Sequence, residues 1–209
     1  MSRVMLQNLE LLNFKSHNKM YYGATQLWFR HPFKRLAGCG PTTGTNLFVY
    51  LSQTNPYFKD IYKGSLNYED VFAFQKKIWK YITPSMMGVN SVEMFNEGAL
   101  NFFKKNHLSV DVLKQLINPK NKIDISVLRD FLLEQISSNR PVAFLNLCAK
   151  NIVELSDWHW VLVVGIEVVS DTVYIYIYDE GFYRKINLSL WLEHTTKDGG
   201  FITYKEKGE

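Results

Sequence analysis

Cysteine is scarce in this sequence, with two residues in a chain of 209. So few thiols exclude the dense disulfide framework of small secreted proteins. The longest apolar run, residues 158–166, is interrupted by His159 and Gly165. It is far shorter than the roughly 20 residues of a membrane-spanning helix. The first ten residues are too polar for a signal peptide. We therefore expect a soluble, cytoplasmic protein with free thiols and no membrane span.

An excess of one charge is also missing. Lysine and arginine number 24 against 20 aspartates and glutamates, the net charge is +4, and no five like charges run together. Binding of nucleic acid requires a more concentrated basic patch, so we do not expect this partner. No pair of cysteines or histidines has the close spacing of a metal site, so we expect neither a metal nor a cofactor. The oligomeric state stays open.

Apolar residues make up 46% of the chain, which is enough for one sizeable core. Helical patterns come first, at about residues 41–53, 67–82 and 92–105, and in a helix that begins at Asp124 or Ser126. Strand patterns follow at about residues 141–147, 158–169, 172–179 and 201–204. This order predicts an α+β fold in which a helical N-terminal half packs on a C-terminal antiparallel sheet.

We predict one domain over residues 1–209. It begins with an N-terminal extension, residues 1–36, in which a short strand is expected around residues 25–29. A mainly helical lobe, residues 37–140, follows, and Asn67 and Ser91 are expected to cap two of its helices. Residues 141–209 form the sheet lobe.

Cys39 lies in the stretch Gly38-Cys39-Gly40-Pro41, directly before a helical pattern. Pro41 suits a first helical turn, because its φ angle is preset and it needs no hydrogen-bond acceptor there. The unpaired amides and the dipole at a helix N-terminus favour a thiolate over a thiol. Gly38 is expected to leave room for a substrate beside the sulfur. Cys148, at the end of an apolar strand, is expected to be a buried structural residue.

His159 begins one predicted strand and Asp179 ends the next, so the turn between them decides whether they meet. A three- or five-residue turn centred on Ser170 places Val161 opposite Asp179, and His159 then lies diagonally from Asp179 on the same face. A two-residue turn would put the two side chains on opposite faces. Glu180 is the weaker candidate for the carboxylate.

The order of these residues resembles that of the papain-like cysteine peptidases, and most closely the branch that processes bacteriocins. The similar stretches are Gly38 to Thr42, Arg140 to Val142, His159 to Gly165 and Tyr178 to Gly181. The resemblance implies the papain-like fold, with Cys39 as the nucleophile, His159 as general base and acid, and Asp179 as the residue that orients His159.

Two features depart from the pattern of this family. Glu180 and Gly181 stand where a proline usually follows the aspartate. The family usually has a glutamine about six residues before the cysteine, where it donates a hydrogen bond to the oxyanion, but this chain has Phe33 there. Gln26, thirteen residues before Cys39, is the upstream glutamine that could replace it.

The sequence therefore predicts a cysteine hydrolase, a peptidase or amidase, that acts on a peptide or other amide through a thioester. Trp158 and Trp160 flank His159 and are either packing residues or platforms for the substrate. The displaced glutamine leaves a second hypothesis open, a papain-like domain that binds or regulates without catalysis. The same thiol could also transfer the acyl or peptidyl group to an amine instead of water.

Overall fold

The computed structural model describes residues 2–16, 19–121, 123–150 and 152–208. Among these residues, seven strands form one sheet and two short strands form another. The large sheet contains β1 (Ser2–Met5), β4 (Val110–Ile117), β5 (Val142–Asn146), β6 (His159–Val169), β7 (Thr172–Asp179), β8 (Phe182–Asn187) and β9 (Gly199–Glu206). The small sheet pairs β2 (Asn13–Ser16) with β3 (Lys19–Tyr22).

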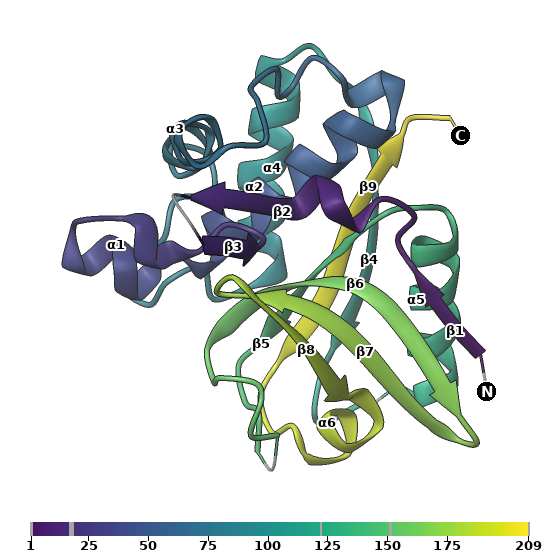
Figure 1. The fold of residues 1–209 in the computed structure, drawn as a ribbon. Coiled ribbons are helices and arrows are strands. Elements are labelled where there is room, and N and C mark those ends of the chain that lie inside the picture. The colour runs from purple at the N-terminus through teal and green to yellow at the C-terminus, as the bar shows by residue number, and fades with distance from the viewer. Residues whose placement is uncertain (1, 17–18, 122, 151, 209) are drawn as a thin grey trace.

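Helices pack against the large sheet, as Figure 1 shows. The α-helices are α1 (Pro32–Ala37), α2 (Cys39–Thr54), α3 (Tyr68–Ile78), α4 (Val92–Lys105), α5 (Ile125–Ser137) and α6 (Leu188–His194). Three short 3-10 helices are η1 (Leu9–Leu12), η2 (Gln26–Trp28) and η3 (Pro56–Phe58). This arrangement confirms the predicted α+β class.

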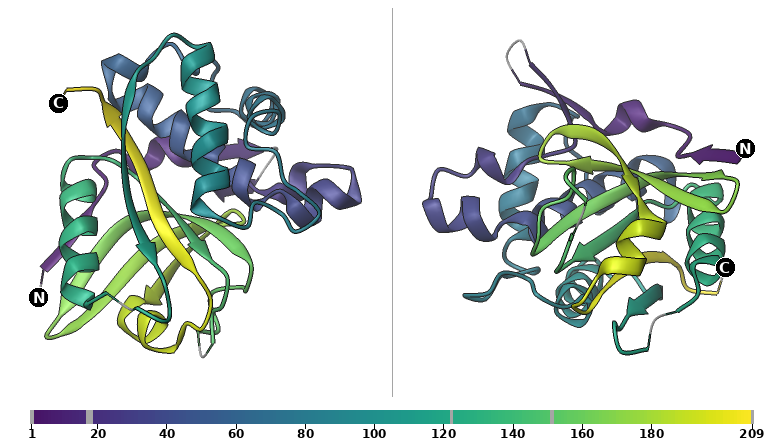
Figure 2. Two further views of the ribbon diagram at one scale, coloured as in Figure 1. Left: turned by 180° about the vertical axis from the view of Figure 1, so that it is seen from behind. Right: turned by 90° about the horizontal axis from the view of Figure 1, so that it is seen from below.

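The large sheet has the strand order β4-β9-β5-β6-β7-β8, with β1 added beside β6, and its paired strands are antiparallel. Strand β4 comes from the segment predicted as the helical lobe, and β1 comes from the predicted extension. Figure 2 shows β4 and β9 as a long pair beside α4, and α5 next to β1. Strands from all three predicted segments therefore share one sheet.

Polar side chains begin three of the helices, as their sequence predicts. The Asn67 side chain accepts a hydrogen bond from the Asp70 amide at the start of α3. Ser91 caps α4 in the same way, and Asp124 caps α5. Each cap supplies an acceptor for an amide that has no partner within its own helix.

Helix α2 is the central helix of the structure. Its residues from Cys39 to Ser52 are all buried, and the helix packs against β6 on one side and α3 on another. One hydrophobic cluster runs from the helices through the sheet among the described residues. This buried position holds the N-terminus of α2 rigidly against the strands.

The segment before α2 differs from the prediction. Residues 25–29 do not form a strand, because Gln26–Trp28 is the 3-10 helix η2, whose first turn is capped by the Thr25 hydroxyl. Pro32 then begins the additional helix α1, which suits a residue with a preset φ angle. Within the described residues, no helix has both the length and the apolar character needed to cross a membrane.

Candidate active site

Cys39 is the first residue of α2, so its thiol sits at a helix N-terminus, where nearby negative charge is stabilised. Gly38 joins α1 to α2. A Cβ atom on Gly38 would lie 2.4 Å from the Lys34 carbonyl oxygen and 3.0 Å from Cβ of Gln26. Glycine is therefore required for the close approach of α1, η2 and α2. The expectation that Gly38 makes room for a substrate is wrong, because that space is filled by the protein itself.

His159 and Asp179 meet in the register predicted for this end of the hairpin, but the predicted turn length is wrong and a bulge restores the register. The turn between β6 and β7 has two residues, since Val169 pairs with Thr172. Continued along the hairpin, this register would put His159 and Asp179 on opposite faces. A β-bulge prevents this: Tyr176 pairs with Gly165, whereas Ile177 pairs with Val163, so Val164 is an extra residue. Beyond the bulge, His159 and Asp179 share a face.

The His159 and Asp179 side chains form a short buried hydrogen bond. Nε2 of His159 lies 2.6 Å from Oδ1 of Asp179, and the two residues are 7% and 5% exposed. Burial by itself lowers the pKa of His159, but hydrogen bonds with Asp179 and with Cys39 outweigh it. Together they hold the pKa of the ring well above its usual range. The imidazole is therefore favoured in its charged form.

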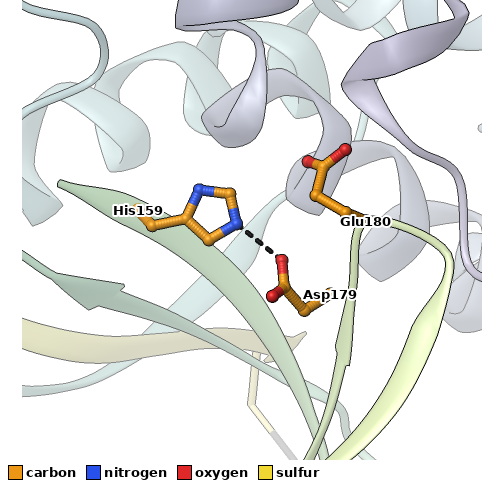
Figure 3. Close-up of side chains that lie close together, drawn as sticks. All are labelled: His159, Asp179 and Glu180. Atoms are coloured by element: carbon orange, nitrogen blue, oxygen red, sulfur yellow. Dashed lines mark hydrogen bonds and ion pairs between the residues drawn. The ribbon is translucent and has the colours of Figure 1, made fainter. Parts of the chain in front are cut away.

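The hydrogen bond to Asp179 also decides which ring nitrogen faces the thiol. An ionised carboxylate can only accept, so Nε2 carries a proton that it donates to Asp179. Figure 3 shows the second ring nitrogen of His159 pointing away from Asp179. Cys39 borders the same pocket as His159, and its thiol is one of the groups that raise the pKa of the His159 ring. This is the arrangement in which an imidazole can take a proton from a thiol.

Cys39, His159 and Asp179 border one pocket of about 600 Å³. Its apolar wall is formed by Phe33, Leu36, Met86, Met87 and Val89. Its polar wall contains Gln26, Asp157, Glu180 and Arg184. Binding sites for small molecules usually have volumes of roughly 300–1,000 Å³, so the pocket can hold a peptide side chain or a ligand of similar size.

Gln26 borders this pocket beside Cys39, although the two are thirteen positions apart. Helix α1 occupies most of the intervening chain and returns it to Gly38, whose position is next to Cβ of Gln26. Oε1 of Gln26 is buried and has no hydrogen-bond partner within the described part of the chain. The side-chain oxygen of Gln26 is thus not held by another of the described residues.

The two tryptophans beside His159 have different environments. Trp158 is 42% exposed and borders the pocket, and Nζ of Lys197 lies 4.3 Å from the centre of its ring. Trp160 is buried, stacks on Phe95 and donates a hydrogen bond of 2.6 Å to the Val89 carbonyl. Trp160 is therefore a core residue, which is the packing alternative of the two that the sequence left open.

Two charged side chains of the pocket, Glu180 and Arg184, have partners that the sequence analysis did not identify. The carboxylate of Glu180 accepts a short hydrogen bond from the Thr25 hydroxyl, and burial raises its pKa even though this bond acts against the rise. Nε of Arg184 lies 3.6 Å from Oδ2 of Asp179. Arg184 follows Asp179 across the β7–β8 turn, and strand alternation alone could have placed it on the same face. No feature of the sequence indicates that Thr25 contacts Glu180.

His159, Asp179 and Glu180 also form a group that could hold a metal ion. One donor atom from each lies within 4.8 Å of the others, in the part of the chain that the structure describes. However, Nε2 of His159 is bonded to Asp179, and Glu180 is bonded to Thr25. A metal ion would have to displace these hydrogen bonds, so the set fits a hydrogen-bonded site better.

The side chains of this pocket supply four different functional groups. They bring together a thiol at a helix start, an imidazole, a carboxylate and a side-chain amide in one pocket. Comparison with protein-family models, with curated proteins and with solved structures found no match.

Proposed function

We propose that this protein is a cysteine hydrolase with a papain-like fold that cleaves an amide bond, in a peptide or a related molecule. The observation that carries the proposal is the convergence of Cys39, His159 and Asp179 on one pocket, in which Nε2 of His159 lies 2.6 Å from Oδ1 of Asp179. A thiol, an imidazole and a carboxylate in this order are the parts that nucleophilic acyl transfer needs.

The reaction follows from these positions. The Cys39 thiolate attacks the carbonyl carbon of the substrate, and the charged His159 gives its proton to the departing amine. A thioester to Cys39 remains. His159 then takes a proton from water, which attacks the thioester, and the carboxylic acid product leaves as the Cys39 thiolate and the charged His159 are restored. Asp179 keeps the ring oriented and stabilises its charge throughout.

The oxyanion formed during this reaction requires hydrogen-bond donors. The backbone amide of Cys39 belongs to the first turn of α2, where amides have no partner within the helix. Gln26 borders the same pocket and supplies the second donor through its side-chain amide. This position of Gln26 favours catalysis over the binding-only alternative, which depended on a missing glutamine.

Alkylation by iodoacetamide tests the activation of Cys39, with Cys148 as an internal control. Cys148 is also buried, and its sulfur lies 3.3 Å from the Thr196 hydroxyl. Burial raises the pKa of the Cys148 thiol, but hydrogen bonds with Thr196 outweigh it and lower the pKa overall. The control therefore has a favourable pKa but no imidazole and no pocket.

At neutral pH we expect Cys39 to be alkylated at least about tenfold faster than Cys148, because the charged His159 stabilises a thiolate at Cys39 and the pocket admits the reagent. The His159→Ala variant should lose this difference without changing the rate at Cys148. Peptide mapping by mass spectrometry measures both sites in one sample. Equal rates at the two thiols of the wild-type protein would refute the proposal.

Hydrolysis itself is tested with a peptide library made by digesting a protein mixture. The wild-type chain should produce new peptide termini, and the Cys39→Ser variant should produce none. If an added amine such as hydroxylamine is incorporated at the new termini, it traps the predicted thioester. A library that stays uncut while its peptides bind equally well to both proteins would favour the binding-only alternative.

A further inference from the structure

Glu180 connects the segment that carries Gln26 to the turn that follows Asp179. Its carboxylate accepts a hydrogen bond from the Thr25 hydroxyl, and the backbone amide of the next residue, Gln26, helps to lower the pKa of Glu180 against the effect of burial. One carboxylate therefore holds the residue directly before Gln26. In Figure 3 this carboxylate is turned away from that of Asp179, which points to His159.

The backbone of the turn fixes the position of Glu180. Asp179 pairs with Phe182, so Glu180 and Gly181 form a two-residue turn, with φ angles of 48° and 81°. A proline could not adopt this conformation, because its ring holds φ near −65°. The Gly181 carbonyl also accepts a hydrogen bond of 3.0 Å from the Tyr22 amide. The turn is thus attached to the N-terminal segment at two places.

Thr25 is held from the opposite side as well. The buried Gln75 of α3 donates through Nε2 to the Thr25 carbonyl at 3.2 Å and to the Thr42 hydroxyl of α2 at 2.6 Å. The backbone of Thr25 is therefore connected to the helix of the nucleophile, and its side chain is connected to the sheet of the base. Gln26, the next residue, therefore lies where the helix that carries Cys39 and the sheet that carries His159 are joined.

We propose that Glu180 is a positioning residue, which together with Thr25 holds the Gln26 amide where the oxyanion forms. This inference rests on the proposed hydrolase function. It gives a role to Glu180, which stands where the family that the sequence resembles usually has a proline. The Glu180 carboxylate also lies within 4.8 Å of a donor atom of His159, so its removal also changes the electrostatic environment of the ring. The experiment must separate an effect on Gln26 from an effect on the charge of His159.

Two reagents at the same sulfur make this separation. Acylation by p-nitrophenyl acetate passes through a tetrahedral oxyanion, whereas alkylation by iodoacetamide does not. Loss of one oxyanion donor reduces the rate of acyl transfer about 10²–10³-fold in a serine peptidase. A displaced Gln26 should therefore slow the burst of p-nitrophenol about tenfold or more, while the rate of alkylation stays unchanged.

The variants are chosen in matched pairs. Glu180→Ala removes the acceptor of the Thr25 hydrogen bond, whereas Glu180→Gln keeps an oxygen that can accept it but loses the charge. Thr25→Val removes the hydroxyl, and Thr25→Ser keeps it. We expect slow acylation with normal alkylation in the Ala and Val variants, and rates close to wild type in the Gln and Ser variants. The Thr25 pair provides the same test if Glu180→Ala does not fold.

Two results would overturn the inference. If Glu180→Gln and Glu180→Ala change alkylation to the same extent, Glu180 acts through the charge of His159. If neither the Ala nor the Val variant slows acylation, Glu180 does not position Gln26. Failure of the hydrolase proposal looks different, because the wild-type Cys39 would then react no faster than Cys148 with either reagent.

Discussion

Replacing Asp179 by asparagine should lower the pKa of His159 without releasing the ring. The side-chain oxygen of asparagine can still accept the proton on Nε2, so the second nitrogen continues to face Cys39. What disappears is the negative charge 2.6 Å from the ring. Loss of a negative partner disfavours the protonated ring, so the pKa moves down.

The magnitude follows from the strength of a charged hydrogen bond. Such bonds contribute about 1.5–3 kcal/mol, and 1.36 kcal/mol corresponds to a tenfold change in an ionisation equilibrium, so the pKa of His159 should fall by about 1–2. Arg184 adds to this effect, because its guanidinium lies 3.6 Å from the same carboxylate and would remain as an uncompensated cation. Both contributions have the same sign.

The assay is an NMR titration of the ring nitrogens of His159 in a Cys39→Ser background, where no thiol titrates with the ring. The exposed His31 and His107 serve as internal references in the same spectra. Asp179→Ala is the matched control, since it removes the acceptor as well as the charge and should also disturb the proton distribution between the nitrogens. An unchanged or higher pKa in the asparagine variant would refute the assigned partnership.

Two further variants, a deletion and a substitution, test the surroundings of the site. Deletion of Val164 removes the extra residue of the bulge but leaves Val163 opposite Ile177, so His159 should stay on the face of Asp179 and Cys39 should still be alkylated rapidly; loss of alkylation in a chain that circular dichroism shows to be folded would mean that the bulge itself shapes the site. Trp160→Phe leaves the buried Val89 carbonyl without its partner, and urea denaturation should show a loss of about 1–3 kcal/mol, whereas an unchanged stability would contradict the core assignment.

Much of the architecture was predictable from local patterns. Helical periodicity and capping residues such as Asn67 and Ser91 locate the helices, because these signals depend on neighbouring residues only. A nearly continuous apolar run likewise locates β6, and alternating residues locate β7. The α+β class follows from the order of these elements along the chain.

The details of the site were less predictable, because they depend on contacts between distant residues. The proximity of His159 and Asp179 was predicted, but with the wrong turn length, since neither composition nor alternation indicates a bulge at Val164. The contact of Thr25 with Glu180 joins residues 155 positions apart, and local sequence contains no signal for it. Trp160 has the side chain of a substrate platform, and only its burial identifies it as a core residue.

Because of the bulge at Val164, the length of the β6–β7 turn does not by itself determine the geometry near Asp179. The Val164 carbonyl accepts a hydrogen bond of 3.0 Å from the Leu6 amide, so a third strand fixes this point of β6 independently of the turn. Ser170 and Asp171 at the tip are exposed. Insertions there, such as a short epitope or a fluorophore attachment sequence, should be tolerated without moving the imidazole, which makes this tip the natural place for a reporter.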